Sequence, residues 1–324
     1  SCIIHVASEQ EPIASGTCGE NLTWTLSEDG TLTISGTGDM TNYLRPEIPW
    51  YSYRSQIVSV FIESGVTSIG DCAFDGCGDL TSIAIPDGVT SIGAGAFENC
   101  SSLTSLTIPS SVVSIGNWAF YRCSGLASIT IPDNVTNIGD CAFYQCSSLT
   151  SLTIPNSVTS IGYGMFDSCS GLTSVTIPNS VTSIGKRAFY GCSSLASITI
   201  PDSVTAIGDC AFTGCSSLTS AAIPDGVTQI CSEAFYGCSS LVSVTIPNSA
   251  TTIGSNAFGL CSSLSNVTIP DSVTDIGGWA FDGCSSLASV TIPESVTSIG
   301  IYAFLRCSSL TDVYFGGTTE EQWN

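Results

Sequence analysis

The sequence predicts a solenoid, of α/β type or mainly β, built from short strands, turns and short helical segments. Phenylalanine, cysteine and proline each recur every 23 positions along most of the 324-residue chain. The repeated phenylalanines are Phe74, Phe97, Phe120, Phe143, Phe166, Phe189, Phe212, Phe235, Phe258, Phe281 and Phe304. A cysteine follows each by three positions, from Cys77 to Cys307, and ten prolines from Pro86 to Pro293 keep the same period. Such short repeats cannot bury an apolar face alone, so we expect them to stack into one elongated body.

The first 56 residues do not repeat, and we expect them to close one end of the stack. Residues 22–26 and 31–35 alternate around Ser27-Glu28-Asp29-Gly30, which predicts a β-hairpin. The following segment holds Pro46, Pro49, Trp50, Tyr51 and Tyr53, an aromatic loop suited to cover the terminal apolar surface. The predicted regions are therefore 1–56 as a cap, 57–309 as eleven repeats, and 310–324 as a partial repeat with a closing segment.

One repeat, residues 103–125, shows how each unit is expected to fold. A short strand ends at Pro109, which has no amide for a ladder, and Ser110-Ser111 forms a turn. Gly116 permits a tight corner or a positive φ. The residues expected to face inward are Leu106, Ile108, Val112, Ile115, Ala119, Phe120 and Cys123.

The repeat resembles the BspA-type leucine-rich repeat of bacterial surface proteins. The residues that carry the resemblance are L-x-x-[IVL]-x-I-P-[DNS]-[SG]-V-x-x-I-G-x-x-A-F-x-x-C-[SG], from Ile57 to Ser309, with departures at Glu63, Cys231 and Ala250. The resemblance implies a right-handed superhelix with a concave parallel sheet and turns or short helices on the convex side. Val313-Tyr314-Phe315-Gly316-Gly317 and Glu320-Glu321-Gln322-Trp323 resemble the closing segment of that family. The family resemblance also implies an extracellular, cell-surface location and an adhesin-like role.

The composition excludes several partners. Six Lys and Arg against 27 Asp and Glu give a net charge of −21, which repels nucleic acid and anionic lipid. No run of eighteen apolar residues exists, so we expect no direct membrane insertion. We expect a monomer without cofactors.

The eleven cysteines of the repeat are expected to form a buried ladder of free thiols rather than disulfides. Stacked side chains keep their Cβ atoms about 4.8 Å apart, wider than the ~3.8 Å of a relaxed bridge. A metal–thiolate array is the alternative, but it lacks CxxC pairs. The state of the other six is left open: Cys2, Cys18, Cys72, Cys141, Cys210 and Cys231.

Catalytic and metal chemistry find little support in the sequence. His5 is the single histidine and lies outside the repeats, which argues against triads and His-based acid–base schemes. Asp202 and Asp225 stack on neighbouring rungs, as do Asp271 and Glu294, so calcium binding is a remote alternative. The Ser-x-Thr columns, such as Ser105 and Thr107, offer hydroxyls without aromatic or charged groups and make ice binding a second one. We predict no catalytic or metal-ligating residue.

The best candidate for a binding site lies where the repeat varies most, around each Ala-Phe pair. Four consecutive rungs place aromatic and basic groups there, on a chain that is otherwise acidic. The candidate residues are Trp118, Tyr121, Arg122, Tyr144, Tyr163, Lys186, Arg187 and Tyr190. Trp118, Tyr121 and Arg122 would share one face if the segment were helical. The alternative is variation at exposed positions, with tyrosines covering the core.

These observations predict a bacterial cell-surface or secreted binding module. The expected partner is a host protein or glycan, in extracellular matrix, mucin or another cell surface. The alternative is a structural spacer that projects another domain from the cell wall. An enzyme is not expected.

Overall fold

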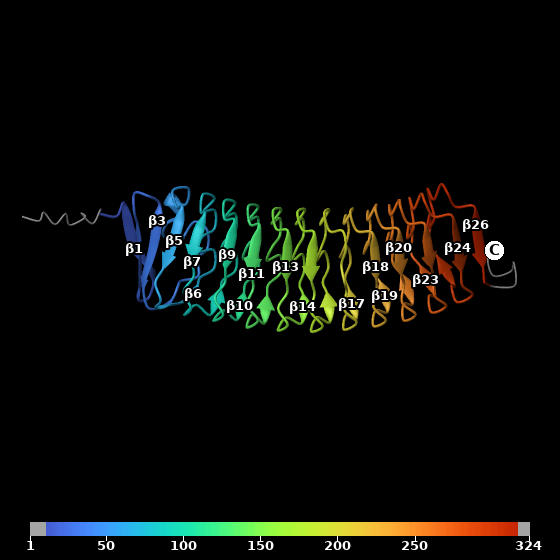
Figure 1. The fold of residues 1–324 in the computed structure, drawn as a ribbon, viewed down its shortest axis with the longest axis horizontal. Coiled ribbons are helices and arrows are strands. Elements are labelled where there is room, and N and C mark those ends of the chain that lie inside the picture. The colour runs from blue at the N-terminus through green and yellow to red at the C-terminus, as the bar shows by residue number, and fades with distance from the viewer. Residues whose placement is uncertain (1–10, 317–324) are drawn as a thin grey trace, which may run out of the picture.

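The computed structural model describes residues 11–316 as a long rod of stacked rungs (Figure 1). The rungs contribute short strands to two parallel columns, in a 23-residue register such as Ser105↔Ser128. The strands of the first column are β5 (Ser59–Ile62), β7 (Ser82–Ala84), β9 (Ser105–Thr107), β11 (Ser128–Thr130), β13 (Ser151–Thr153), β15 (Ser174–Thr176), β18 (Ser220–Ala222), β20 (Ser243–Thr245), β22 (Asn266–Thr268), β24 (Ser289–Ile292) and β26 (Asp312–Phe315). Those of the second column are β6 (Val66–Ile69), β8 (Ser91–Ile92), β10 (Ser114–Ile115), β12 (Asn137–Ile138), β14 (Ser160–Ile161), β16 (Ser183–Ile184), β17 (Ala206–Ile207), β19 (Gln229–Ile230), β21 (Thr252–Ile253), β23 (Asp275–Ile276) and β25 (Ser298–Ile299).

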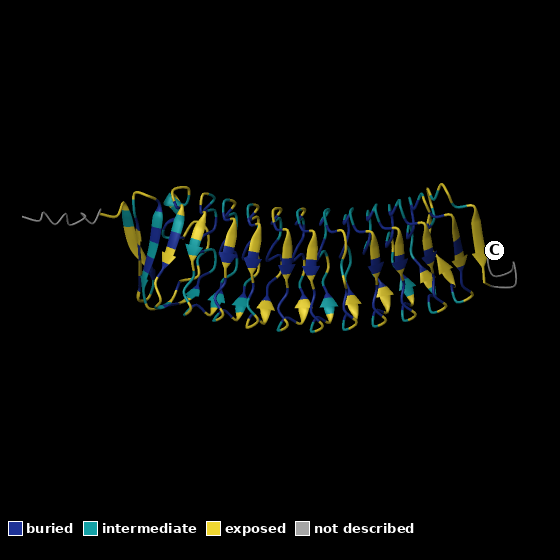
Figure 2. Ribbon diagram, in the orientation of Figure 1, coloured by how far each residue is buried: buried dark blue, intermediate teal, exposed yellow. Residues whose placement is uncertain are grey.

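The structure is thus a parallel β-solenoid, and the second strand column was not predicted. The columns are divided into sheets of two to five strands, and residues 197–199 form no strand at all. The rod bends only slightly along its length (Figure 2). In the three-residue strands from β9 to β22 of the first column, the middle residue is buried and its neighbours are exposed, as in Ser128–Thr130.

The predicted short helical segments are wrong. Within residues 11–316 the one helical element is the 3₁₀ turn η1 (Tyr51–Tyr53), in the cap. The segment around each Ala-Phe pair is instead a chain of turns, in which the residues two before and two after the phenylalanine have positive φ. In one rung these are Trp118 (φ 56°) and Arg122 (φ 58°), a conformation incompatible with a right-handed helix.

This turn segment bonds to the next rung through alternate amides. The amides of Trp118, Phe120 and Arg122 donate to carbonyls of the following rung at 2.7–2.9 Å. The amides between them close local turns, as Tyr121 N does on the Trp118 carbonyl. The chain of turns buries the consecutive side chains of Ala119 and Phe120 and leaves Trp118 and Arg122 exposed.

The phenylalanines form one continuous stack through the rod. Centroids of successive rings from Phe74 to Phe304 lie 5.2–5.6 Å apart, and ring planes differ by 22° or less. Burying such a ring stabilises a fold by about 1.5–3 kcal/mol. The stack explains the 23-residue spacing, because one ring per rung fills the same place in the core.

The ladder cysteines are free thiols, as predicted, and almost all are buried. They are more than small apolar groups, because each from Cys100 to Cys307 donates from Sγ to the phenylalanine carbonyl of the preceding rung. These Sγ–O distances are 2.9–3.2 Å. The ladder therefore couples each rung to its neighbour through a hydrogen bond as well as through packing.

The cap extends both strand columns of the solenoid by one strand each. β1 (Ala14–Gly19), β2 (Leu22–Leu26) and β3 (Thr31–Gly36) pair antiparallel, and β3 continues the first column by pairing parallel with β5. β4 (Gly38–Asp39) pairs parallel with β6 and extends the second column.

Trp50 closes the core beneath this cap, as the sequence indicated for the aromatic loop. It is fully buried and stacks on Phe74 at 5.9 Å. Its indole Nε1 donates to the Ala73 carbonyl at 2.8 Å, taking the place of the amide that a preceding rung would offer. The division into 1–56, 57–309 and 310–324 stays a prediction, and Glu320–Trp323 lies outside the described residues.

Candidate binding surface

The eight candidate residues lie on the turn segments of four successive rungs, those of Phe120, Phe143, Phe166 and Phe189. Relative to the phenylalanine, they occupy the columns three and two residues before it and one and two residues after it: Tyr163 and Lys186; Trp118 and Arg187; Tyr121, Tyr144 and Tyr190; Arg122. Since successive ring centroids here lie 5.3–5.6 Å apart, the four rungs form one local surface.

The centre of this surface is a pair of stacked tyrosines. The rings of Tyr121 and Tyr144 lie 4.6 Å apart with an interplanar angle of 7°. The guanidinium of Arg122 lies 5.2 Å from the Tyr121 centroid, and its Nε donates to Gln145 Oε1 at 2.9 Å. Partial burial raises the pKa of the Tyr144 hydroxyl above its ordinary value. The cluster is therefore a preformed amphipathic edge with one guanidinium.

An open groove of about 530 Å³ runs beside the tyrosine pair. It is lined by Arg122, Ser124, Gln145, Ser147, Ser168, Ser170 and Gly191. In the column two residues after the phenylalanine, the long side chains of Arg122 and Gln145 are followed by the small residues Ser168 and Gly191. The surface is therefore lower on the last two of the four rungs. The sequence analysis missed Gln145 and the serines, although the column two residues after phenylalanine is one of the variable columns around each Ala-Phe pair.

Trp118 and Tyr163 project from the neighbouring columns. Their side chains are 47 % and 46 % exposed, respectively, which is high for large aromatics. Trp118 is placed outward by its positive φ, and the amide of Tyr163 is held by Asp140 Oδ1 at 2.9 Å. These two side chains are free to contact a partner through their ring faces.

Arg187, by contrast, is used within the fold. Its Nε lies 2.8 Å from Oδ2 of Asp167, a carboxylate only 2 % exposed, and its guanidinium covers the Tyr190 ring at 3.7 Å. The charge of Asp167 requires such a partner, because an unpaired buried carboxylate is costly. Lys186 Nζ lies 3.9 Å from Asp209 Oδ2 in an exposed pair.

We call this ion pair, between an arginine and the aspartate that directly follows a core phenylalanine, an arginine–aspartate clasp; it occurs twice more. Arg306 pairs with the nearly buried Asp282, and Arg45 of the cap pairs with the buried Asp75 and also with Glu98. Each aspartate follows a core phenylalanine directly, in the column that holds Tyr121 elsewhere. Three of the six basic residues of the chain thus neutralise aspartates in this one column. Among the described residues, Arg122 is the basic residue of the candidate surface that has no acidic ion-pair partner.

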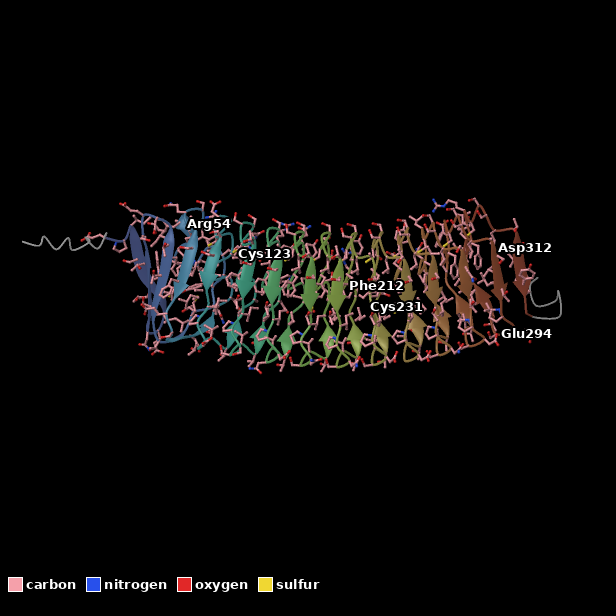
Figure 3. The ribbon with its side chains drawn as sticks, in the orientation of Figure 1. Arg54, Cys123, Phe212, Cys231, Glu294 and Asp312 are labelled. Carbon is pink, nitrogen blue, oxygen red and sulfur yellow. The ribbon has the colours of Figure 1, made fainter. Side chains whose placement is uncertain are left out.

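The described residues form no evident metal-binding or acid–base site. Among residues 11–316 no group of three or more His, Cys, Asp or Glu side chains is arranged to hold a metal ion. Asp202, Asp225, Asp271 and Glu294 all lie at exposed turn positions, and Figure 3 shows Glu294 at the rim of the rod. His5 and Cys2 lie outside the described residues.

The cysteines outside the ladder follow two patterns. Cys72, Cys141 and Cys210 occupy the positive-φ column two residues before phenylalanine, and Cys18 lies buried in the cap. Cys231, labelled in Figure 3, is only partly buried. All are free, and burial raises the pKa of each, so they too are protonated thiols at neutral pH.

In the described part of the chain no helix has the length and apolar character needed to cross a membrane.

The repeat, the parallel strand columns and the phenylalanine core together define the rod as a leucine-rich repeat solenoid. A family model described as "BspA type Leucine rich repeat region (6 copies)" matches residues 48–173, 136–265 and 228–322. The chain therefore belongs to the BspA-type leucine-rich repeat family.

Solved structures of bacterial leucine-rich repeat proteins are similar to this chain. One from Eubacterium ventriosum is 28 % identical, with a TM-score of 0.59, and the match covers 96 % of this chain and 98 % of that one. One from Bacteroides ovatus is also 28 % identical, with a TM-score of 0.60 over 91 % of this chain and 93 % of that one. A leucine-rich repeat protein of T. pallidum is 30 % identical, with a TM-score of 0.50 over 62 % of this chain and 90 % of that one. No curated protein matches the sequence.

Proposed function

We propose that this protein is a non-catalytic, adhesin-like binding module of a bacterial cell surface, or a secreted one, that contacts a host protein or glycan. The observation that carries the proposal is the Tyr121–Tyr144 pair with Arg122 beside an open groove. Tyrosine, tryptophan and arginine dominate the energetics of protein recognition. Membership of the BspA-type family supports the surface location.

The contact residues on which we rely are Trp118, Tyr121, Arg122, Tyr144 and Tyr163. Lys186, Arg187 and Tyr190 lie at the edge of the same surface, but Arg187 and Tyr190 contribute first to the clasp around Asp167. The expected ligands are extracellular matrix proteins, mucin or components of another cell surface.

The repeat itself supplies variants that test the surface without disturbing the fold. Trp118→Gly and Arg122→Gly relieve positive-φ positions that hold glycine in other rungs, at Gly95 and Gly191. Tyr121→Thr introduces the residue found at Thr213 in that column. We expect this triple variant to remain folded and to lose at least about tenfold in affinity for immobilised matrix protein or mucin. Trp279→Gly, at an equivalent position distant along the rod, is the control.

A structural spacer is the second candidate, because the phenylalanine stack runs unbroken from Phe74 to Phe304 and favours a stiff rod. A spacer predicts that the wild-type chain binds none of these ligands. Equal binding by wild type and triple variant would instead refute the candidate surface while leaving an adhesin possible.

A further inference from the structure

A second feature breaks the regularity of the rod, on the outer face of the first strand column. The residue two positions before the repeat proline is threonine in most rungs, for example Thr107, Thr130 and Thr153. In the first rung it is Phe61, and in the next it is Ala84. These two residues are register partners of the adjacent strands β5 and β7, near the capped end of the rod (Figure 1).

The side chain of Phe61 faces solvent and not the core. Its side chain is 52 % exposed, whereas the residues on either side of it in β5, Val60 and Ile62, are 3 % and 2 % exposed. On one side it is level with Thr33 of the cap strand β3, and on the other with Ala84. Because alanine is shorter than the usual threonine, the face of the Phe61 ring on the Ala84 side is left open.

A depression of about 480 Å³ lies at this place. Its lining includes Phe61, Glu63, Ser64, Ala84, Ile85 and Pro86. Glu63 stands where other rungs have proline, and its amide donates to the Ile34 carbonyl of the cap at 2.9 Å. That bond accounts for the loss of proline. It does not account for a half-exposed aromatic ring or for the alanine beside it.

We propose that this depression is a saccharide-binding site for a neutral pyranose chain. The site presents an aromatic face, a carboxylate and a hydroxyl side by side. A pyranose offers the complement, because its axial C–H bonds form an apolar face that packs on the electron-rich face of an aromatic ring. Its equatorial hydroxyls can donate to the Glu63 carboxylate and exchange hydrogen bonds with Ser64. The net charge of −21 disfavours acidic sugars at the same position.

The surface beyond the depression suits a chain better than a single sugar. Outer hydroxyls of Ser82, Ser105 and Thr107 follow on adjoining strands, at intervals of about 4.8 Å between strands. A 1,4-linked pyranose chain advances by about one such interval per sugar. An extended peptide repeats its side-chain direction only every ~6.6 Å and falls out of step with the rungs. The periodicity therefore favours a polysaccharide over a peptide.

The test uses the whole chain and residues that the repeat itself provides. Phe61→Thr and Ala84→Thr each restore the common residue of the column on an exposed face, so both variants should fold. Tyr314→Thr, in the same column and 57 % exposed, is the matched control. Saturation-transfer NMR with cellohexaose and mannohexaose measures binding, and hexagalacturonate is the charged comparison.

We expect the wild type to bind a neutral hexaose, with saturation strongest on the axial protons of the sugar. Phe61→Thr should weaken binding by about tenfold, as expected for loss of a stacked ring, and Ala84→Thr should weaken it severalfold by filling the notch. Tyr314→Thr and the Trp118, Tyr121 and Arg122 triple variant should bind as the wild type does. Absence of binding to both neutral hexaoses, equal binding by Phe61→Thr, or equal binding of hexagalacturonate would each overturn the proposal. Loss of binding in the triple variant alone would move the sugar to the other surface.

Discussion

At the residue scale, the ladder thiols and the positive-φ residues decide most of the local energetics. Each ladder cysteine combines burial with a donor to the carbonyl of the preceding rung, as Cys123 does to Phe97 at 3.0 Å. The second group is unusual because fifteen of the described positive-φ residues are not glycine. Such residues are unfavourable in this conformation by about 1–2 kcal/mol. They persist because neighbouring rungs bond the backbone on both sides.

The buried thiols predict a loss of stability at alkaline pH. Burial raises the pKa of Cys77, Cys123 and Cys238 from 9.0 to about 12. Above pH 9 the unfolded chain therefore releases thiol protons that the folded chain retains, and folding becomes less favourable as pH rises towards 12. Each of these three thiols lowers the free energy of unfolding by about 1.4 kcal/mol per pH unit in this window.

Circular dichroism melts between pH 7 and 11 measure this effect. We expect a Cys123→Ala, Cys146→Ala double variant to be less stable at pH 7, because it loses two Sγ hydrogen bonds, yet to show a shallower fall above pH 9. An equal slope for wild type and variant would mean that these thiols do not drive the transition.

Backbone strain in the turn segments gives a second prediction. Glu233 has a φ of 58°, and Glu233→Gly should stabilise the rod by roughly 1 kcal/mol by removing the left-handed penalty. Gly214 has a φ of 74° and ample room for a methyl group, so Gly214→Ala should destabilise by a similar amount through conformation alone. Thermal midpoints measured by calorimetry would test the pair, and shifts of the same sign would contradict the assignment.

At the scale of elements, the turn segment is where sequence reasoning failed. The inward residues Ala119, Phe120 and Cys123 were predicted from their spacing, because a repeated apolar residue must face the core. The same spacing suits a helix, so periodicity alone could not separate a helical turn from successive turns of alternating handedness. Trp118 and Arg122 carry no signal of positive φ, which is usually marked by glycine or asparagine. The candidate surface itself stays a prediction, but the helical backbone expected for it is wrong.

The clasp around Asp167 yields a prediction at this scale. Arg187→Cys, which keeps a non-glycine residue as at Cys141 in the same positive-φ column, leaves a buried carboxylate without its ion pair and should cost roughly 2 kcal/mol, less than for a fully buried pair because Arg187 is about a third exposed. Adding Asp167→Tyr, which supplies the residue found at Tyr144 in that column, should recover most of the loss. Chemical denaturation of both single variants and the double variant forms a thermodynamic cycle. Additive effects would show that the two side chains are not coupled.

At the scale of the whole molecule, the fold is a one-dimensional stack whose stability depends on neighbouring rungs and on the cap. Trp50 connects the two, through its stack on Phe74 and its bond to the Ala73 carbonyl. Trp50→Ala should cost about 3–5 kcal/mol. Amide hydrogen exchange should rise in the first rungs, β5 to β8, and stay unchanged around β20. A uniform rise along the rod would show that the rungs open together rather than from the end.

The repeat also separates architecture from function over the whole chain. Phe, Cys and Pro define the stack, and the two candidate sites arise where other positions depart from it: around Tyr121 on the turn segments and around Phe61 on the first strand column. The first was predicted from the sequence. The second was not, because the exposure of the Phe61 ring and the depression beside it are visible only in the structure.

The central claim is that the turn segments of residues 118–163 contact the ligand. Hydroxyl-radical footprinting of the chain, free and bound to a matrix protein or mucin identified by its binding, tests this most directly. We predict protection of Trp118, Tyr121, Tyr144 and Tyr163, with Trp279 and Tyr302 unchanged as internal references. Unchanged oxidation of those four residues in the complex, with protection elsewhere on the rod, would contradict the claim.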